Sequence, residues 1–269
     1  MSKRTEMINA FYDAYQEDTR LEKSRHGQLE YLTTMHYIHN LIPEGSAILE
    51  IGAGTGRYSI ALAKEGHYVT AVELSDGNLA LLKERAQGID NLKSFKGDAL
   101  DLSRFDDNSF DATLVLGPMY HLYKHEDQFQ ALNEAIRVTK PNGVIITAFL
   151  SIYAIMQDNY LQNNFKLGFQ ENFTDDFDVR HFTEQLFTGF YIDEFEDLFC
   201  KLPVTHLATV ATDGILELAA MTRDFGMSDE DFDIFAKYHL HNCEKREYLG
   251  SSSHLIHICK KQEVNYYDF

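Results

Sequence analysis

A glycine-rich segment carries the strongest chemical signature in the sequence. Gly52, Gly54 and Gly56 follow the apolar run Ala47–Ile51 and precede a stretch with helical periodicity. Glycines let a ligand approach the backbone where a Cβ would clash, and the amides of a helix N-terminus offer donors and a positive dipole end. The third glycine comes one residue earlier than in the GxGxxG segment of dinucleotide sites, and the acidic Glu50 beside the loop would repel a pyrophosphate. The pattern favours a ligand that carries an ammonium and a sulfonium.

Two carboxylates stand where the next two strands are expected to end. Glu73 follows the run Tyr68–Val72, and Asp98 with Ala99 follows the run Leu92–Phe95. A carboxylate at the end of the second strand can accept hydrogen bonds from both hydroxyls of a ribose. A carboxylate after the third strand can accept one from the exocyclic amine of an adenine. Together they indicate a nucleoside site beside the glycine-rich segment.

The segment Gly117–Leu122 follows the fourth apolar run, at the edge where ligands of open α/β sheets bind. It contains Tyr120 and His121, which we take as candidate catalytic residues. An imidazole has an unperturbed pKa near ~6.5, so His121 can accept a proton from a bound acceptor at neutral pH. The alternative is that His121 packs or anchors the loop. His125 lies four residues on, but no third ligand accompanies the pair, so no metal site is predicted.

The N-terminal segment offers further side chains that could contact a ligand. A tyrosine could pack on a sulfonium through a cation–π contact, and an arginine could pair with a carboxylate. The residues concerned are Tyr12, Tyr15, Arg20 and Arg25. We take Tyr15 and Arg25 as candidate substrate contacts, with simple packing as the alternative for each. His239 and His241 are expected on the surface of a helix.

Aromatic side chains gather between residues 151 and 198, where no clear strand pattern appears; Phe173, Phe182 and Phe187 are among them. We expect this region to form a lid that excludes water from the acceptor. Aromatic side chains in an acidic chain would suit a flat or cationic acceptor, such as an amine.

The elements that must position these residues follow an α/β rhythm. Apolar strands that alternate with amphipathic helices imply a mostly parallel sheet covered on both faces. Strands are expected at 47–51, 68–72, 92–95, 111–116, 144–149, 204–210 and 254–260. Helical segments are expected at 5–42, 57–64, 79–86, 128–138, 191–202 and 213–246. Pro141-Asn142-Gly143 is expected to form a turn before the fifth strand.

The ordered set of glycine-rich loop, Glu73, Asp98 and Gly117–Leu122 resembles the class I S-adenosylmethionine-dependent methyltransferases, in the branch of small bacterial methyltransferase-domain enzymes. The resemblance covers roughly residues 45–150 and the strand near 254–260. It implies a Rossmann-like, doubly wound sheet of seven strands in the order 3-2-1-4-5-7-6, with the last strand antiparallel.

The resemblance also implies how the chain is divided. We expect an N-terminal helical cap at 1–44, a cofactor-binding core at 45–150 and an aromatic lid with a returning helix at 151–202. Residues 203–269 would complete the sheet and carry a helical insertion. The cap and the insertion after strand five would cover the substrate.

The same resemblance assigns roles to the site residues. The glycine-rich loop would hold the methionine part of S-adenosylmethionine, Glu73 its ribose, and Asp98 with Ala99 its adenine. S-adenosylhomocysteine would be the product. The cofactor-binding residues so implied are Glu50, Gly52, Ala53, Gly54, Gly56, Glu73, Leu74, Asp98, Ala99, Leu116 and Gly117. The segment with Tyr120 and His121 would face the reacting methyl group.

Composition limits the possible partners. The formal net charge is −18, which opposes the phosphate contacts that a nucleic-acid partner would need. Three cysteines, none in a CxxC pair, indicate neither a disulfide framework nor a zinc site and suit a reducing compartment. The sequence has no apolar run near the ~20 residues that span a bilayer and no apolar signal core at its start, so a cytoplasmic location without a membrane partner is expected. The oligomeric state is not indicated.

The leading functional hypothesis is methyl transfer to a small-molecule acceptor. A methyltransferase for RNA or protein is an alternative, although no Asn-Pro-Pro-Tyr-type tetrapeptide follows the fourth strand, where the sequence has Gly117-Pro118-Met119-Tyr120. A non-catalytic protein that binds the same cofactor is a second alternative, which the intact loop disfavours. A nicotinamide-dependent oxidoreductase is disfavoured by the glycine spacing and Glu50.

Overall fold

The computed structural model describes residues 3–14, 20–161, 164–180, 186–222 and 225–263. A seven-stranded sheet in the order β3-β2-β1-β4-β5-β7-β6 forms its centre. The strands are β1 Ala47–Ile51, β2 Tyr68–Glu73, β3 Leu92–Lys96, β4 Phe110–Val115, β5 Thr139–Leu150, β6 Val204–Ala211 and β7 His254–Lys261. β7 is antiparallel to both β5 and β6, and the other pairs are parallel. The predicted strand order and the antiparallel last strand are confirmed.

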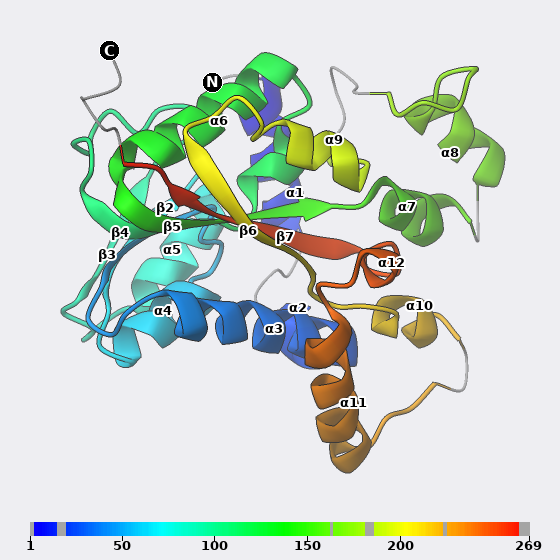
Figure 1. Cartoon of the computed structure of the whole chain (residues 1–269), viewed down its shortest axis with the longest axis horizontal. Coiled ribbons are helices and arrows are strands. Elements are labelled where there is room, and N and C mark those ends of the chain that lie inside the picture. Colours follow the sequence, from blue (N-terminus) through cyan, green and yellow to red (C-terminus); the bar gives the residue numbers. More distant parts are fainter. Residues whose placement is uncertain (1–2, 15–19, 162–163, 181–185, 223–224, 264–269) are drawn as a thin grey trace.

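Helices cover both faces of the sheet (Figure 1). Helices α3 Arg25–Leu41, α4 Arg57–Lys64 and α5 Asp76–Arg85 lie on one face, and α6 His125–Val138 and α9 Ile192–Asp197 on the other. This double cover explains the continuous apolar runs of the central strands such as β1 and β4, whereas the edge strands β3 and β6 are partly exposed. Phe149 of β5 is fully buried and stacks on Phe195 of α9, with ring centroids 3.9 Å apart.

Two helix starts show how local chemistry sets the element bounds. Ser75 caps α5 by accepting a hydrogen bond from the amide of Asn78, so this helix begins at Asp76 rather than at the predicted Leu79. Gly56 precedes α4 with a positive φ of 89°, a conformation that favours glycine. The helix then runs over Arg57–Lys64, as predicted.

The predicted turn at Pro141-Asn142-Gly143 is instead an irregularity inside β5. The strand begins at Thr139, which pairs with Phe110 of β4, and regular pairing resumes only at Val144, opposite Ala112. Asn142 takes a positive φ of 61°. The chain therefore kinks without leaving the sheet, because the extra residues are accommodated as a bulge.

The segments outside the core are helical. The predicted helix at 5–42 is divided into α1 Lys3–Ala14, α2 Arg20–Lys23 and α3. The aromatic region holds α7 Ile152–Ile155, a π-helical turn at Met156–Tyr160 and α8 Phe165–Asn172, and α9 is shorter than the predicted helix at 191–202. The insertion before β7 holds α10 Leu216–Ala220, α11 Asp229–Asn242 and α12 Arg246–Leu249. No helix in the described part of the chain has the length and apolar character needed to span a membrane.

The prediction that His239 is a surface residue is wrong. Its side chain is fully buried, with Nε2 donating to the carbonyl of Ala211 at 2.9 Å and Nδ1 lying 3.3 Å from the hydroxyl of Tyr248. Burial lowers the pKa of His239 to about 4, so the ring stays neutral at pH 7. The neighbouring His241 is exposed, as predicted.

Candidate cofactor and acceptor site

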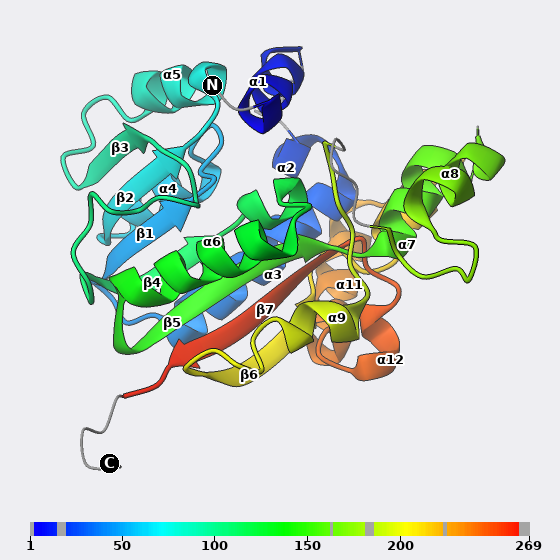
Figure 2. The same cartoon turned by 90° about the horizontal axis from the view of Figure 1, so that it is seen from above.

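A cavity of about 380 Å³ lies at the carboxyl ends of β1, β2 and β4. Helix α1, which packs beside α5 (Figure 2), contributes Ile8, Phe11 and Tyr12 to its lining. The predicted site residues that line the cavity are Gly52, Gly54, Glu73, Leu74, Asp98, Ala99, Leu116, Gly117, Tyr120 and His121. Residues from four separate segments thus converge on one hollow, as expected for the ligand edge of an open α/β sheet.

The first two glycines of the loop are shaped for close approach. Gly52 has a φ of +77°, and a Cβ built on it would lie only 2.7 Å from Cδ of Pro118. Gly54 has a φ of 55°. Gly56 does not line the cavity, because the space that its Cβ would take is filled by Leu82 and Ile60, with Cγ of Leu82 at 2.9 Å. The first two glycines therefore serve the cavity, and the third serves the packing of α4.

Glu73 ties the glycine loop to the end of β2. One carboxylate oxygen accepts a hydrogen bond from the amide of Gly54 at 2.6 Å, and the other accepts one from the amide of Ser75 at 2.7 Å. Glu73 is only 6% exposed, yet it lines the cavity. An ionised carboxylate offers about four acceptor positions and can therefore serve several donors at once.

Glu50 has a different environment from the one predicted. It is 1% exposed, does not line the cavity, and accepts a hydrogen bond from the hydroxyl of Ser59 in α4. Burial raises the pKa of Glu50 to about 8, with a smaller contribution from the charge of Glu73, while Ser59 opposes the shift. Direct contact between Glu50 and a ligand is therefore wrong for this geometry. Ala53 is also buried away from the cavity.

Asp98 is paired across the cavity rim with a residue that the sequence analysis missed. The guanidinium of Arg4, in α1, donates to one oxygen of Asp98, and the amide of Leu100 donates to the other at 3.2 Å. Both Arg4 and Asp98 line the cavity. The pair links the N-terminal helix to the loop after β3, and a ligand amine near Asp98 would share this carboxylate with Arg4.

His121 is held on both sides of its ring. Nδ1 donates to the carbonyl of Leu186 at 2.6 Å, so Nε2 accepts the hydrogen bond from the hydroxyl of Tyr12 at 3.0 Å. Burial lowers the pKa of His121 to about 4, aided by the charge of Arg4 and opposed by Leu186. The ring is neutral at pH 7 and is a weak base, which favours the alternative that His121 anchors neighbouring segments.

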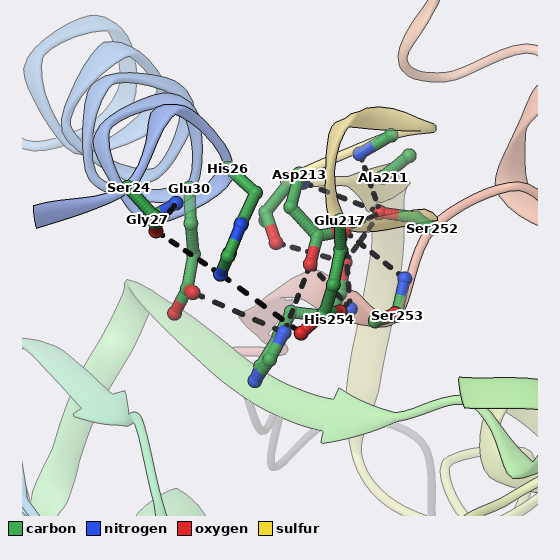
Figure 3. Close-up of polar contacts among 12 residues, drawn as sticks. Ser24, His26, Gly27, Glu30, Ala211, Asp213, Glu217, Ser252, Ser253 and His254 are labelled. Atoms are coloured by element: carbon green, nitrogen blue, oxygen red, sulfur yellow. Dashed lines mark hydrogen bonds and ion pairs between the residues drawn. The ribbon is translucent and has the colours of Figure 1, made fainter. Parts of the chain in front are cut away.

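A second wall of the cavity contains ionisable residues that the sequence analysis did not single out. His26 of α3, Glu217 of α10 and His254 of β7 line it (Figure 3). The sequence carried a signal for His254 alone. An antiparallel last strand must begin at the edge where the parallel strands end, and this is the edge where a ligand is expected. The contacts of His26 and Glu217 depend on how the helices pack, and no sequence spacing reveals them.

The candidate substrate contact Arg25 is wrong. Its guanidinium donates to the carbonyl of Met227 at 3.0 Å and to Asp229, and it lies over the ring of Phe232, 5.0 Å from the centroid. Arg25 therefore fastens α3 to α11 and does not reach the cavity. The other candidate, Tyr15, lies outside the described residues, as do Phe182 and the side chain of Arg20. His125 is exposed at the start of α6.

Comparison with known proteins agrees with this geometry. Residues 48–143 match the family model of a methyltransferase domain. A demethylmenaquinone methyltransferase from Clavibacter sepedonicus is 33% identical over 150 residues, which are 54% of this chain and only 59% of that protein. A SAM-dependent methyltransferase from Methanosarcina mazei superposes with a TM-score of 0.57 at 19% identity, over 84% of this chain and 97% of that one. A possible histamine N-methyltransferase from Thermotoga maritima gives 0.59 at 18% identity, over 97% and 100%.

These likenesses define the fold. The chain has the fold of the class I S-adenosylmethionine-dependent methyltransferases. Residues 48–143, which match the methyltransferase-domain model, include the glycine loop, Glu73 and Asp98.

Proposed function

We propose that this protein transfers the methyl group of S-adenosylmethionine to a small-molecule acceptor. The hydrogen bond from the Gly54 amide to Glu73 carries the proposal, because it sets a glycine loop and a carboxylate side by side on the wall of one cavity. The methyltransferase domain and the fold support the same reading.

The residues present fit the cofactor. The backbone at Gly52 and Gly54 would hold the methionine part, because both glycines line the cavity with a positive φ that bulkier residues rarely adopt. Glu73 would accept hydrogen bonds from the ribose, and Asp98 with Ala99 would border the adenine. S-adenosylmethionine supplies an electrophilic methyl group on a sulfonium, which a nucleophile takes by in-line displacement.

The remaining task of the chain is to position the acceptor and exclude water. Ile8 and Phe11 of α1, together with Phe187, contribute apolar lining to the cavity. The Arg4–Asp98 pair and the Tyr12–His121 hydrogen bond hold α1 against the cavity. Both links come from a helix outside the methyltransferase domain, as expected for a segment that encloses the acceptor.

The net charge of −18 supports a small-molecule acceptor over RNA, because an RNA partner would need a basic surface. Demethylmenaquinone, named for the relative from Clavibacter sepedonicus, is a candidate acceptor for direct trial. Since that match covers only 59% of the relative, it does not decide the acceptor.

Calorimetry tests the proposal. We expect S-adenosylmethionine and S-adenosylhomocysteine to bind the purified protein and NADH not to bind. Tight binding of NADH without any heat from the two adenosyl compounds would overturn it. Incubation with isotope-labelled cofactor and a cell metabolite extract, read by mass spectrometry, then identifies the acceptor as the compound that gains a labelled methyl group.

A further inference from the structure

At the second wall of the cavity, His26, Glu217 and His254 line the hollow, and the carboxylates of Asp213 and Glu30 lie behind them against His254. The acidic wall, as we name it, consists of Glu30, Asp213 and Glu217 with His26 and His254 (Figure 3). Nδ1 of His254 lies 2.9 Å from Asp213 and 3.9 Å from Glu30, and Nε2 of His26 lies 4.0 Å from Glu217. These residues come from α3, the end of β6, α10 and the start of β7, so the fold assembles them from distant parts of the chain.

Asp213 orients His254. It is fully buried, and its carboxylate accepts hydrogen bonds from the hydroxyl of Ser252 and from the amides of Ser253, at 3.0 Å, and His254, at 3.2 Å. It also accepts the Nδ1 hydrogen of His254 at 2.9 Å. This bond assigns the ring proton to Nδ1, which makes Nε2 the basic nitrogen. In Figure 3 that nitrogen points away from the carboxylates.

Two polar atoms of the wall are shielded and still require a partner. Oε2 of Glu217 and Nδ1 of His26 are buried and have no hydrogen-bond partner among the described residues. Both side chains line the cavity. Buried polar atoms are almost always hydrogen-bonded, so atoms of this kind on a cavity wall point to a ligand that completes them.

We propose that the acidic wall binds an amine acceptor, and that His254 takes the proton which the amine loses. The inference rests on the methyl-transfer function proposed above. Carboxylates near a nucleophile oppose an oxyanion and favour a group that becomes positively charged, because like charges at a few ångströms repel strongly in a shielded site. An amine meets this condition, since its nitrogen gains positive charge as it attacks.

The step balances without another reactant. The amine binds as an ammonium, and one N–H proton passes to Nε2 of His254. The lone pair so freed forms the new nitrogen–carbon bond with the methyl group, while the carbon–sulfur bond breaks and its electron pair stays on sulfur. The methylated product leaves as an ammonium. Asp213 and Glu30 stabilise the imidazolium that results, until the proton leaves to water.

A divalent metal is the competing occupant. Ligand atoms of Asp213, Glu217 and His254 lie within 4.8 Å of one another, a spacing that a metal ion could bridge. However, Asp213 already accepts hydrogen bonds from backbone, serine and imidazole donors, and Nδ1 of His254 donates to it. A metal would have to displace this network, so the geometry favours the amine.

Binding to the protein saturated with S-adenosylhomocysteine tests the inference without turnover. The probes are 2-phenylethylamine and other aralkylamines, each with its matched alcohol and carboxylic acid, and phenols of the same size. We expect amines to bind, and Glu217→Gln to weaken that binding about 10- to 100-fold, the scale of a lost charged hydrogen bond. The affinity for S-adenosylhomocysteine should not change. Glu230→Gln, at an exposed position of α11, is the matched control and should have no effect.

Turnover separates the role of His254 from binding. His254→Gln should lower kcat for a methylated amine by about 10²-fold, the range for a lost proton acceptor, with little change in amine affinity. Alcohols, phenols or acids that bind as well as the amines would overturn the inference, as would the binding of no amine. Tight Mn²⁺ or Zn²⁺ binding that Asp213→Asn abolishes would assign the wall to a metal instead. Failure of S-adenosylhomocysteine itself to bind would contradict the proposed function.

Discussion

The hydroxyl of Tyr12 lies 3.0 Å from Nε2 of His121, a contact between residues 109 positions apart. It joins α1 to the segment after β4, and the opposite nitrogen of the same ring joins that segment to the carbonyl of Leu186. Three parts of the cavity wall therefore meet at one neutral imidazole. The ring of His121 is therefore placed to hold α1 against the cavity.

We expect Tyr12→Phe to have no further effect in a protein that already carries His121→Ala. Both changes remove the Tyr12–His121 hydrogen bond, which contributes about 1 kcal/mol, so the affinity for S-adenosylhomocysteine should fall roughly fivefold in Tyr12→Phe. His121→Ala also loses the bond to Leu186 and should fall at least as far, and the double variant should match His121→Ala because the two residues act as a pair. Calorimetry on the four proteins completes the cycle. A His121→Ala variant with unchanged affinity and about 10²-fold lower turnover would restore His121 as the general base.

Stability should fall in acid because three histidines are buried in neutral form. Burial lowers the pKa of His121 and His239 to about 4 and that of His257 to about 3. The unfolded chain titrates near ~6.5, so it binds more protons than the folded chain below that pH. The stabilisation is therefore complete above pH ~6.5 and is lost as the pH falls through the folded values.

Urea unfolding at pH 7.5, 5.5 and 4.5 measures this effect. We expect the free energy of unfolding to decrease with each step, with a loss of roughly 1–3 kcal/mol from each ring over the whole window. Glu50 opposes this loss in part, because its raised pKa of about 8 means that the folded chain binds a proton which the unfolded chain releases. His241 is exposed and provides the control, since His241→Gln should leave the slope unchanged. A free energy of unfolding that stays constant from pH 7.5 to 4.5 would show that these rings are not held neutral by the fold.

The scaffold was predictable because its signals are local. Continuous apolar runs such as Ala47–Ile51, separated by helical stretches, define buried parallel strands, and the glycines mark the ligand edge. The helix bounds that were predicted wrongly depend on single contacts, such as the Ser75 cap that starts α5 before the predicted residue. The residues predicted at the glycine-rich edge line one cavity for the same reason, because they follow directly after strands.

The cavity lining from α1, α3, α10 and β7 was largely missed because it depends on tertiary packing. Arg4 reaches Asp98 across 94 positions, and Arg25 turns toward Asp229 instead of the cavity. Helical periodicity does not indicate which way the side chain of either arginine points. Glu50 was interpreted as a carboxylate beside the ligand, whereas the alternation of its strand points it at Ser59 in the interior.

We expect Gly52→Ala to weaken cofactor binding more than Gly45→Ala does, although both glycines have a left-handed backbone. Both Gly52, at φ +77°, and Gly45, at φ +72°, have left-handed backbones, so alanine costs about 1 kcal/mol at either position. Only at Gly52 would the new Cβ meet a neighbour, Cδ of Pro118 at 2.7 Å, while Gly45 has open space. The loop must shift in the first variant alone.

Thermal unfolding and calorimetry on the two variants separate the effects. Both should lose similar stability from backbone strain, with a further loss for Gly52→Ala from the clash. Only Gly52→Ala should bind S-adenosylhomocysteine more weakly, by roughly tenfold or more if the shifted loop loses one charged hydrogen bond. Equal affinities in the two variants would mean that the ligand does not depend on the position of this loop.

Variants of Glu73 separate two contributions to cofactor binding, the hydrogen bonds to the glycine loop and those to the ribose. Glu73→Ala removes the acceptor for the Gly54 and Ser75 amides and also any acceptor for the ribose. We expect it to weaken S-adenosylhomocysteine binding by roughly 1.5–3 kcal/mol, the scale for hydrogen bonds to a charged group. Glu73→Gln keeps one carbonyl oxygen, which can accept from one amide but not serve both amides and a ribose diol, so its loss should be intermediate.

Titration with S-adenosylhomocysteine and with its 2′-deoxyribose analogue then measures how much of the binding free energy comes from the ribose. The wild-type protein should prefer the natural ligand, and Glu73→Ala should bind the two alike. A preference for the 2′-hydroxyl that survives in Glu73→Ala would place the ribose against another side chain.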